Sequence, residues 1–163
     1  MDDFQRDLIA LLPRLRRFAR ALASNAADAD DLVQTAVERG LARRSQWRPD
    51  TSLASWMFAI MKNARIDEVR VRDRRARLMR PEDEGRQTAD GAAADPLLRT
   101  AVERAMDALP MEQRLAVALV LVEGLSYAEA SRVLGTPEGT LTSRLVRGRL
   151  ALMAQLQGME PRG

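Results

Sequence analysis

The residues best suited to binding another molecule lie near the C-terminal end of the chain, between Glu138 and Arg149. If this stretch is helical, one face gathers small, hydroxyl-bearing and arginine side chains. That mixture suits a helix in the major groove of DNA, where arginine reads guanine and hydroxyls bond to base edges. Flanking arginines can hold phosphates. The predicted DNA-reading set is Gly139, Thr142, Ser143, Val146 and Arg147, flanked by Arg144 and Arg149.

Two short helices joined by a tight turn are expected to position this face. Ser126 can cap the first helix with its hydroxyl, with Glu129 three residues later. Gly135 suits the left-handed conformation of a helix end. Thr136, followed by Pro137, predicts the start of the second helix. The spacing indicates a helix-turn-helix, and an ordinary helical hairpin is the alternative. The buried stripe of the second helix is predicted to be Leu141, Leu145, Gly148 and Leu152.

Composition favours helices and argues against catalysis. The 163 residues contain no Cys and no His, so a disulfide framework, a thiolate metal site and the commonest general base are all excluded. The acidic and arginine side chains are predicted to cluster on the outer faces of helices. They do not converge on a candidate catalytic pocket. We therefore expect no catalytic residue, no metal and no cofactor. Apolar content comes mainly from Ala, Leu, Val and Met, which predicts an all-α fold.

The charge distribution divides the chain. All but one of the 26 basic residues are Arg, which favours bidentate contacts with phosphate or guanine, although a high-GC coding bias would also explain it. Residues 62–80 have a net charge of +5 and residues 81–98 one of −4. A basic block beside an acidic one suggests a nucleic-acid surface followed by a linker. The predicted organisation is two small helical domains, 1–80 and 99–158, joined by a flexible acidic linker over 81–98.

Apolar periodicity predicts the remaining helices. In the first domain they cover 4–23, 28–45 and 53–77, with Pro13 a start or kink of the first and Thr51 or Ser52 capping the third. In the second domain they cover 97–108 and 111–123. The last of these contains LAVALVLV, a run rich in β-branched residues that could be mistaken for a buried strand.

Three stretches carry a resemblance to a known family. GLSYAEASRVLGTPEGTLTSRLVRGRL, from Gly124 to Leu150, resembles the C-terminal DNA-binding region of extracytoplasmic-function sigma factors. DADDLVQT (28–35) and WRPDTSLASWMFAIMKNARIDEVRVRDRR (47–75) resemble the N-terminal domain of the same family, region 2. Thr142 departs from the family by replacing its usual basic residue, and Ala130 by replacing a bulkier apolar one. The resemblance implies sigma region 2 and sigma region 4 joined by a linker.

The resemblance also implies roles for individual residues. The helix of the DLVQ run would contact core RNA polymerase. The loop at 47–52 and the helix after it would read the minus-ten promoter element and hold a flipped base. Trp47 could stack on such a base, although it could equally be a hydrophobic plug. The implied polymerase contacts are Asp31, Leu32, Gln34 and Thr35. The implied minus-ten contacts are Trp47, Arg48, Ser52, Asn63, Arg65, Arg70 and Arg74, while Gly139, Thr142, Ser143, Arg144, Val146, Arg147 and Arg149 would read the minus-thirty-five element.

The function implied is that of an alternative sigma factor that directs promoter recognition and melting. Its partners would be core RNA polymerase, promoter DNA and an anti-sigma factor. No run approaches the roughly 18 apolar residues of a membrane span, so we expect no membrane insertion and a cytoplasmic location. Two alternatives stay open. A sigma-like protein could merely sequester an anti-sigma factor, and a helix-turn-helix repressor would explain residues 125–149 but not residues 28–77.

Overall fold

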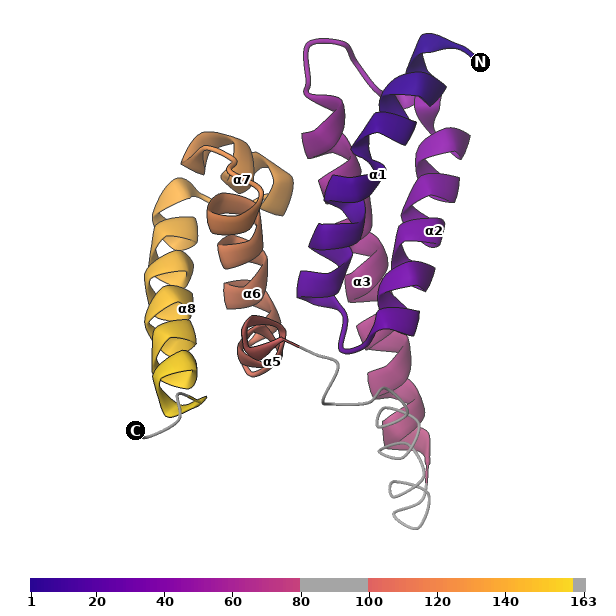
Figure 1. The fold of residues 1–163 in the computed structure, drawn as a ribbon. Helices are drawn as coiled ribbons and strands as arrows, with labels where there is room; N and C mark the ends of the chain where they lie inside the picture. Colours follow the sequence, from indigo (N-terminus) through magenta and orange to yellow (C-terminus); the bar gives the residue numbers. More distant parts are fainter. Residues whose placement is uncertain (80–99, 160–163) are drawn as a thin grey trace.

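The computed structural model describes residues 1–79 and 100–159 and is shown in Figure 1. In this part of the chain every regular element is helical. The first half contains α1 (Asp3–Leu22), α2 (Ala26–Ala42), a short 3-10 helix η1 (Arg44–Gln46) and α3 (Leu53–Leu78). The second half contains α5 (Ala101–Asp107), α6 (Met111–Val117), a π-helical turn η4 (Ala118–Val122), α7 (Tyr127–Leu134) and α8 (Glu138–Met159). The all-α prediction is therefore confirmed, while the predicted linker over 81–98 lies outside the described residues.

Side-chain caps set where the helices of the first half begin. Asp2 and Gln5 form a reciprocal capping box at the start of α1. Asn25 caps α2, and Ser52 caps α3 by accepting the Ser55 N–H at 3.1 Å. Pro13 neither starts nor ends α1, which continues through it. Pro13 is exposed, so water can satisfy the carbonyl that loses its N–H partner.

The core of the first half lies between α1, α2 and α3. Phe18 and Phe58 meet there with ring centroids 4.8 Å apart, at a tilt that aromatic pairs favour. Gly40 allows α2 to approach α3 closely, since a Cβ at this position would lie 2.7 Å from the Met57 sulfur. The fully buried side chains of this half include Leu15, Phe18, Leu22, Leu32, Met57, Phe58 and Met61.

The run LAVALVLV is helical and not a strand. Its first residues end α6, and the rest form η4, in which the Glu123 N–H bonds to the Ala118 carbonyl five residues back at 2.9 Å. Ala116, Ala118 and Leu119 are fully buried, so the segment forms the centre of the second half. No helix within the described ranges is long and apolar enough to cross a membrane.

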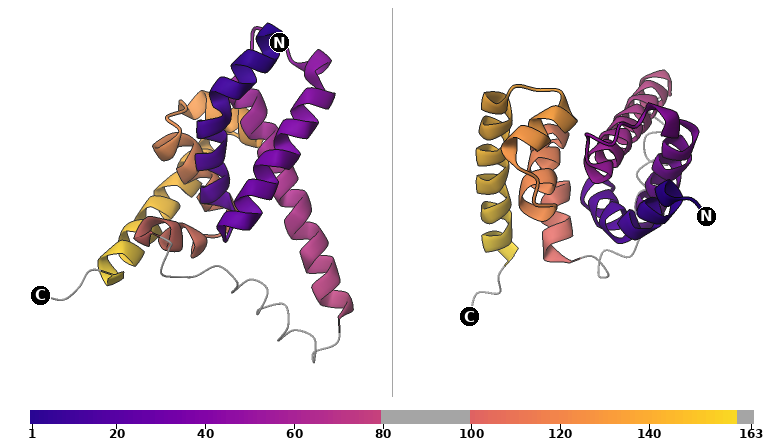
Figure 2. Two further views of the ribbon diagram at one scale, coloured as in Figure 1. Left: turned by 45° about the vertical axis from the view of Figure 1, so that its right-hand side comes forward. Right: turned by 90° about the horizontal axis from the view of Figure 1, so that it is seen from above.

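The two halves pack against each other. α1 contacts α5, α6 and η4, and α3 contacts α7. α8 packs on α5, α6 and α7, on the side away from α1, α2 and α3 (Figures 1 and 2). The contact between the halves includes polar groups. Arg14 and Arg17 of α1 bond to Glu123, and Arg114 of α6 bonds to the Leu22 carbonyl.

Candidate nucleic-acid and polymerase interfaces

α7, Gly135 and α8 form the predicted helix-turn-helix. The Ser126 hydroxyl accepts the Glu129 N–H at 3.1 Å and donates to the Glu129 carboxylate at 3.1 Å, which fixes the start of α7. Gly135 ends α7 in the left-handed region at φ 65°, where a side chain would be strained. The two helix boundaries predicted from Ser126 and Gly135 are confirmed.

The cap predicted for the second helix is wrong. α8 begins at Glu138, and the Thr136 hydroxyl is buried with no hydrogen-bond partner in the described chain. Instead, the Pro137 carbonyl accepts the Leu141 N–H at 3.1 Å and so takes the cap position. The Thr142 hydroxyl donates to the Glu138 carbonyl at 2.8 Å, which directs it along the helix rather than outward.

The buried face of α8 holds the helix against α6. Leu141 and Leu145 are buried, as predicted. Gly148 lies where α8 meets α6 most closely, because a Cβ there would lie 2.8 Å from Val117 Cγ2 and 3.2 Å from the Gln113 carbonyl oxygen. This contact fixes the rotation of α8 and therefore which of its residues face outward.

The predicted minus-thirty-five set lies largely on the outer face of α8. Thr142 and Arg144 are half-buried, and Arg144 Nε lies 3.7 Å from a carboxylate oxygen of Glu112 on α6. Arg147 and Arg149 have no ion-pair partner within residues 1–79 and 100–159, so both guanidinium groups can take up a phosphate or a base edge. The exposed members of the set are Gly139, Ser143, Val146, Arg147 and Arg149.

The predicted polymerase surface on α2 divides into exposed and buried residues. Asp31 and Gln34 are exposed, and Gln34 bonds to the Glu38 carboxylate at 3.3 Å. Thr35 is half-buried. Leu32 is 0% exposed, so its side chain belongs to the core and cannot touch a partner in this conformation. Asp31 and Gln34 are therefore the groups of this set that are best placed for a contact.

Trp47 acts as a plug in this structure. Its ring lies 5.9 Å from that of Phe4, and its indole N–H donates to the Thr51 carbonyl at 3.0 Å. Phe4 also meets Trp56, with ring centroids 6.3 Å apart. The loop before α3 is thus pinned to the start of α1, which favours the structural role that the sequence left open for Trp47. Arg48 is exposed beside it.

The basic residues of α3 differ in availability. Arg65 is only 4% exposed, and its guanidinium bonds to Glu68 at 3.2 Å, so it is not presented to a phosphate here. Arg72 donates to Asp28 of α2 at 2.8 Å, and this hydrogen bond raises the pKa of Arg72. Burial lowers the pKa of Lys62. The exposed members of the predicted minus-ten set on α3 are Asn63, Arg70 and Arg74.

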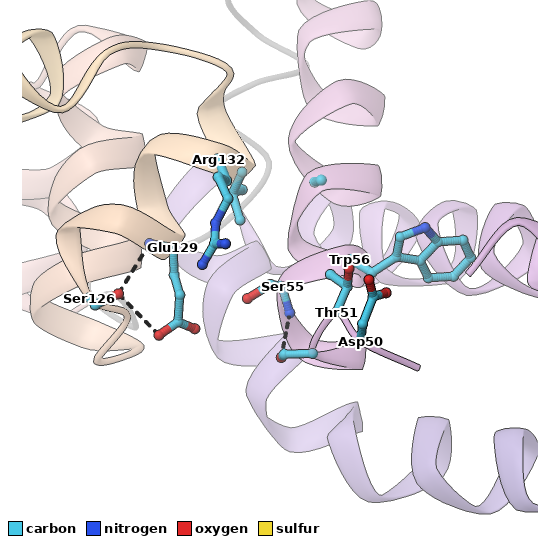
Figure 3. Close-up of a pocket in the computed structure, with 10 residues that line it drawn as sticks. Asp50, Thr51, Ser55, Trp56, Ser126, Glu129 and Arg132 are labelled. Carbon is cyan, nitrogen blue, oxygen red and sulfur yellow. Dashed lines mark hydrogen bonds between the residues drawn. The ribbon is translucent and has the colours of Figure 1, made fainter. Parts of the chain in front are cut away.

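A cavity of about 460 Å³ separates the loop before α3 from α7 (Figure 3). Ser52 and Ser55 line one side, while Glu129 and Arg132 of α7 line the other. The sequence had not placed these two elements together, because they are distant in the chain and each has an ordinary polar surface. The remaining lining residues are Asp50, Thr51, Trp56, Ala59, Ser126 and Val133.

Comparison with known families finds matches in both halves. Residues 8–62 match the family model described as the Sigma2 domain of PhyR, and residues 99–152 match the model described as Sigma-70, region 4. The chain is 36% identical to the ECF RNA polymerase sigma factor EcfG of Rhodopseudomonas palustris, over 95% of this chain and 86% of that protein. It is 37% identical to the ECF RNA polymerase sigma factor SigM of Mycobacterium tuberculosis, over 89% of this chain and 72% of the relative.

Solved structures resemble the whole fold. The sigma factor RpoE of Bartonella quintana, crystallised with the anti-sigma factor NepR, aligns with a TM-score of 0.78 and 28% identity. The alignment covers 98% of this chain and all of the other. CnrH, solved with the cytosolic domain of CnrY, aligns with a TM-score of 0.66 and 27% identity over 96% of this chain and 91% of the other.

Proposed function

Because the chain belongs to the extracytoplasmic-function sigma factors, we propose that it binds core RNA polymerase and directs it to promoters. The observation that carries this proposal is the exposed arginine face of α8, held outward by the close contact of Gly148 with α6. A helix presented in this way by a helix-turn-helix fits the major groove. Residues 1–80 would be the polymerase and minus-ten domain, residues 99–158 the minus-thirty-five domain, and residues 81–98 the linker between them.

In this proposal each surface has a distinct task. Asp31 and Gln34 on α2 contact the polymerase, with Leu32 and Thr35 shaping the helix beneath them. Asn63 offers a donor and an acceptor to an unpaired base edge, and Arg70 and Arg74 hold phosphates farther along α3. These groups bind and position, so the chain acts as a transcription regulator and catalyses no reaction of its own. We place this role in the cytoplasm because that is where its family works on RNA polymerase.

An anti-sigma factor is the partner expected to control the chain. The similar RpoE of Bartonella quintana was crystallised with the anti-sigma factor NepR. That likeness extends over both halves of the chain, since the alignment covers 98% of it. We propose that a protein of this class holds the chain inactive until a signal releases it.

A second candidate function is sequestration of an anti-sigma factor without any action on polymerase. The family model that matches residues 8–62 is the one described for PhyR, and a PhyR fragment was solved in complex with NepR. That PhyR structure shares only 21% identity with the chain, so it supports the fold alone. The exposed arginines of α8 favour the sigma-factor function, because a decoy for a protein partner needs no DNA-reading face.

Competition for purified core RNA polymerase against the housekeeping sigma factor tests the proposal. Wild type should displace the competitor, and the Asp31→Ala/Gln34→Ala double variant should not. The Asp73→Ala/Gln155→Ala variant is the matched control, because it removes the same two functional groups from exposed positions outside α2. If wild type binds DNA or NepR but never polymerase, the sequestration function replaces the proposed one.

A further inference from the structure

The middle of the outer face of α8 carries no charge. At about 100° per residue, Gly139 and Val146 lie within about 20° of each other, opposite the buried Gly148. Arg147 and Arg149 lie roughly 80° to either side of Gly139. These two arginines can reach phosphates along both edges of a groove, so the uncharged middle of the helix faces the bases between them.

Thr142 lies next to this middle line, and its hydroxyl proton is already used. The hydroxyl donates to the Glu138 carbonyl, four residues back, at 2.8 Å. Because a threonine hydroxyl has a single proton, Thr142 cannot also donate to a base while this bond is kept. The other heavy atom on its Cβ is a methyl group. The basic residue that the family usually has here would offer donors to guanine, whereas Thr142 offers a methyl.

Thr142 and Val146 together form what we call the methyl pair. They are four residues apart and therefore neighbours on one face of the helix. Both are β-branched, and a helix restricts the χ1 angle of such side chains, so their methyl groups keep few positions. Gly139 continues the same face toward the start of α8. A Cβ on Gly139 would meet no atom within 4 Å, so the helix backbone is free to approach base pairs closely there.

The position of Val146 is more informative than its exposure. Val146 is 52% exposed, but Val102 on α5 is 50% exposed as well, so an exposed valine alone does not indicate a contact. Only Val146 of the two lies between arginines that can bind phosphate. Arg144 does not cover it, since Arg144 Nε lies 3.7 Å from the Glu112 carboxylate of α6, to the side of the helix. An apolar group is thus presented where base edges would lie.

The major groove offers one apolar group to such a pair, the C5 methyl of thymine. The other groups on the base edges are donors and acceptors, which a methyl would desolvate without satisfying. Four residues advance about 6 Å along α8, and DNA rises about 3.4 Å per base pair, so the two contacted thymines should lie within about two base pairs of each other.

We propose that Thr142 and Val146 read thymine methyl groups in the minus-thirty-five element and so determine part of its sequence. The inference rests on the proposed promoter-binding function and deepens it, because it names the chemical group that this helix recognises. The arginines beside the pair supply affinity for phosphate, and the methyl pair supplies discrimination between bases.

Removal of single methyl groups from the DNA tests the proposal. A randomised duplex library, selected with the full chain alone and with its complex with core polymerase, gives the sequence that each form binds best. Each thymine of that sequence is then replaced in turn by deoxyuridine, which lacks only the C5 methyl. Loss of one buried methyl should weaken binding about fourfold at each contacted thymine.

Two substitutions at Thr142 separate its methyl from its hydroxyl. Thr142→Ser keeps the hydroxyl and should bind the thymine duplex about fourfold more weakly, with no further loss on deoxyuridine at one position. Thr142→Val keeps a methyl and should respond to deoxyuridine as wild type does. The opposite pattern, with Ser like wild type and Val weakened, would show that the hydroxyl reads the base and would overturn the assignment of Thr142.

Val146→Ala tests the second member of the pair. It should abolish the response to deoxyuridine at a position within about two base pairs of the first. Val102→Ala is the matched control, because it makes the same change at an equally exposed valine outside α8 and should leave every response unchanged. Since both valines are exposed, both variants should remain folded, which circular dichroism checks.

The outcomes distinguish this inference from the function on which it rests. If the library yields a preferred sequence but no response to deoxyuridine depends on Thr142 or Val146, methyl readout is overturned while promoter binding is retained. If neither the free chain nor its complex with core polymerase selects any sequence, the proposed function has failed, and methyl readout fails with it.

Discussion

Gly148 gives the sharpest prediction about how the DNA-reading helix is held. In Gly148→Ala the new Cβ would lie 2.8 Å from Val117 Cγ2 and 3.2 Å from both the Cβ and the carbonyl oxygen of Gln113. Neither neighbour can move without a cost in energy. Val117 is β-branched and therefore stiff, and the Gln113 atoms are the helix backbone and the Cβ attached to it. Overpacking of this kind costs about 1–3 kcal/mol.

The same change in the same helix provides the control. A Cβ on Gly139 would meet no atom within 4 Å, so Gly139→Ala should show only the benefit of alanine over glycine in a helix, about 0.5–1 kcal/mol. In Gly148→Ala that benefit is offset by the clash, which leaves a net loss of about 0–2.5 kcal/mol. The two variants should therefore differ in free energy of unfolding by about 2 kcal/mol. If residues 99–158 unfold as a domain of their own, this difference corresponds to roughly 8–16 °C in Tm.

Urea and thermal unfolding followed by far-UV circular dichroism would measure this difference. The expected result is a lower midpoint for Gly148→Ala and a higher one for Gly139→Ala. Equal stabilisation by both substitutions would refute the reasoning, because it would mean that α8 does not rest on α6 as closely as the structure has it. The outward direction of Arg147 and Arg149 would then lose its structural basis.

Three further predictions concern binding and pH. Arg147→Ala should weaken promoter binding more than Glu138→Ala in a titration at fixed salt, because only Arg147 lies on the groove face; equal effects would contradict that face assignment. Asn63→Ala should impair open-complex formation, measured by permanganate reactivity of the melted strand, while core binding is retained; a loss of core binding would show that Asn63 has another role. Asp2 accepts the Gln5 N–H and pairs with Arg44, and both interactions lower its pKa below the ordinary value of 3.8. Its stabilising contribution should be present above that value and disappear as the pH falls through the lowered pKa, so the unfolding midpoints of wild type and Asp2→Ala should converge at the acid end of a series from about pH 6 to pH 2. A constant difference across the series would rule out the carboxylate as the source.

Local signals were sufficient to predict most of the elements. Periodicity and a capping serine placed α3 at 53–77, and the structure has it from Leu53 to Leu78 behind Ser52. Gly135 ended α7 as expected, because a left-handed residue strongly favours glycine. Thr136 looked equally suitable as a cap, but its hydroxyl is buried without a partner in the described chain, and the first helical hydrogen bond of α8 runs from the Leu141 N–H to the Pro137 carbonyl.

Long-range packing set the limits of the sequence prediction. Arg65 has a residue type that is usually exposed, and its pairing with Glu68 three residues later is local, but its burial depends on packing against other parts of the fold that helical spacing does not reveal. Leu32 was expected on a contact surface, but the packing of α2 places its side chain in the core. Glu123 finds its partners more than 100 residues earlier in the chain, a pairing that no helical spacing can reveal.

The contact of Glu123 with Arg14 and Arg17 depends on the hydrogen-bond register of the π-helical turn η4. The Glu123 N–H bonds five residues back to Ala118, and the Leu125 N–H bonds six residues back to Leu119. In a regular α-helix each residue advances about 100° around the axis, so a shift of these bonds by one residue would turn the Glu123 side chain away from α1. Segment length between α6 and Gly124 is therefore as important to domain docking as the identity of the carboxylate. A relative with one residue more or fewer in this turn would present a different side chain to α1, even if its helix-turn-helix were unchanged.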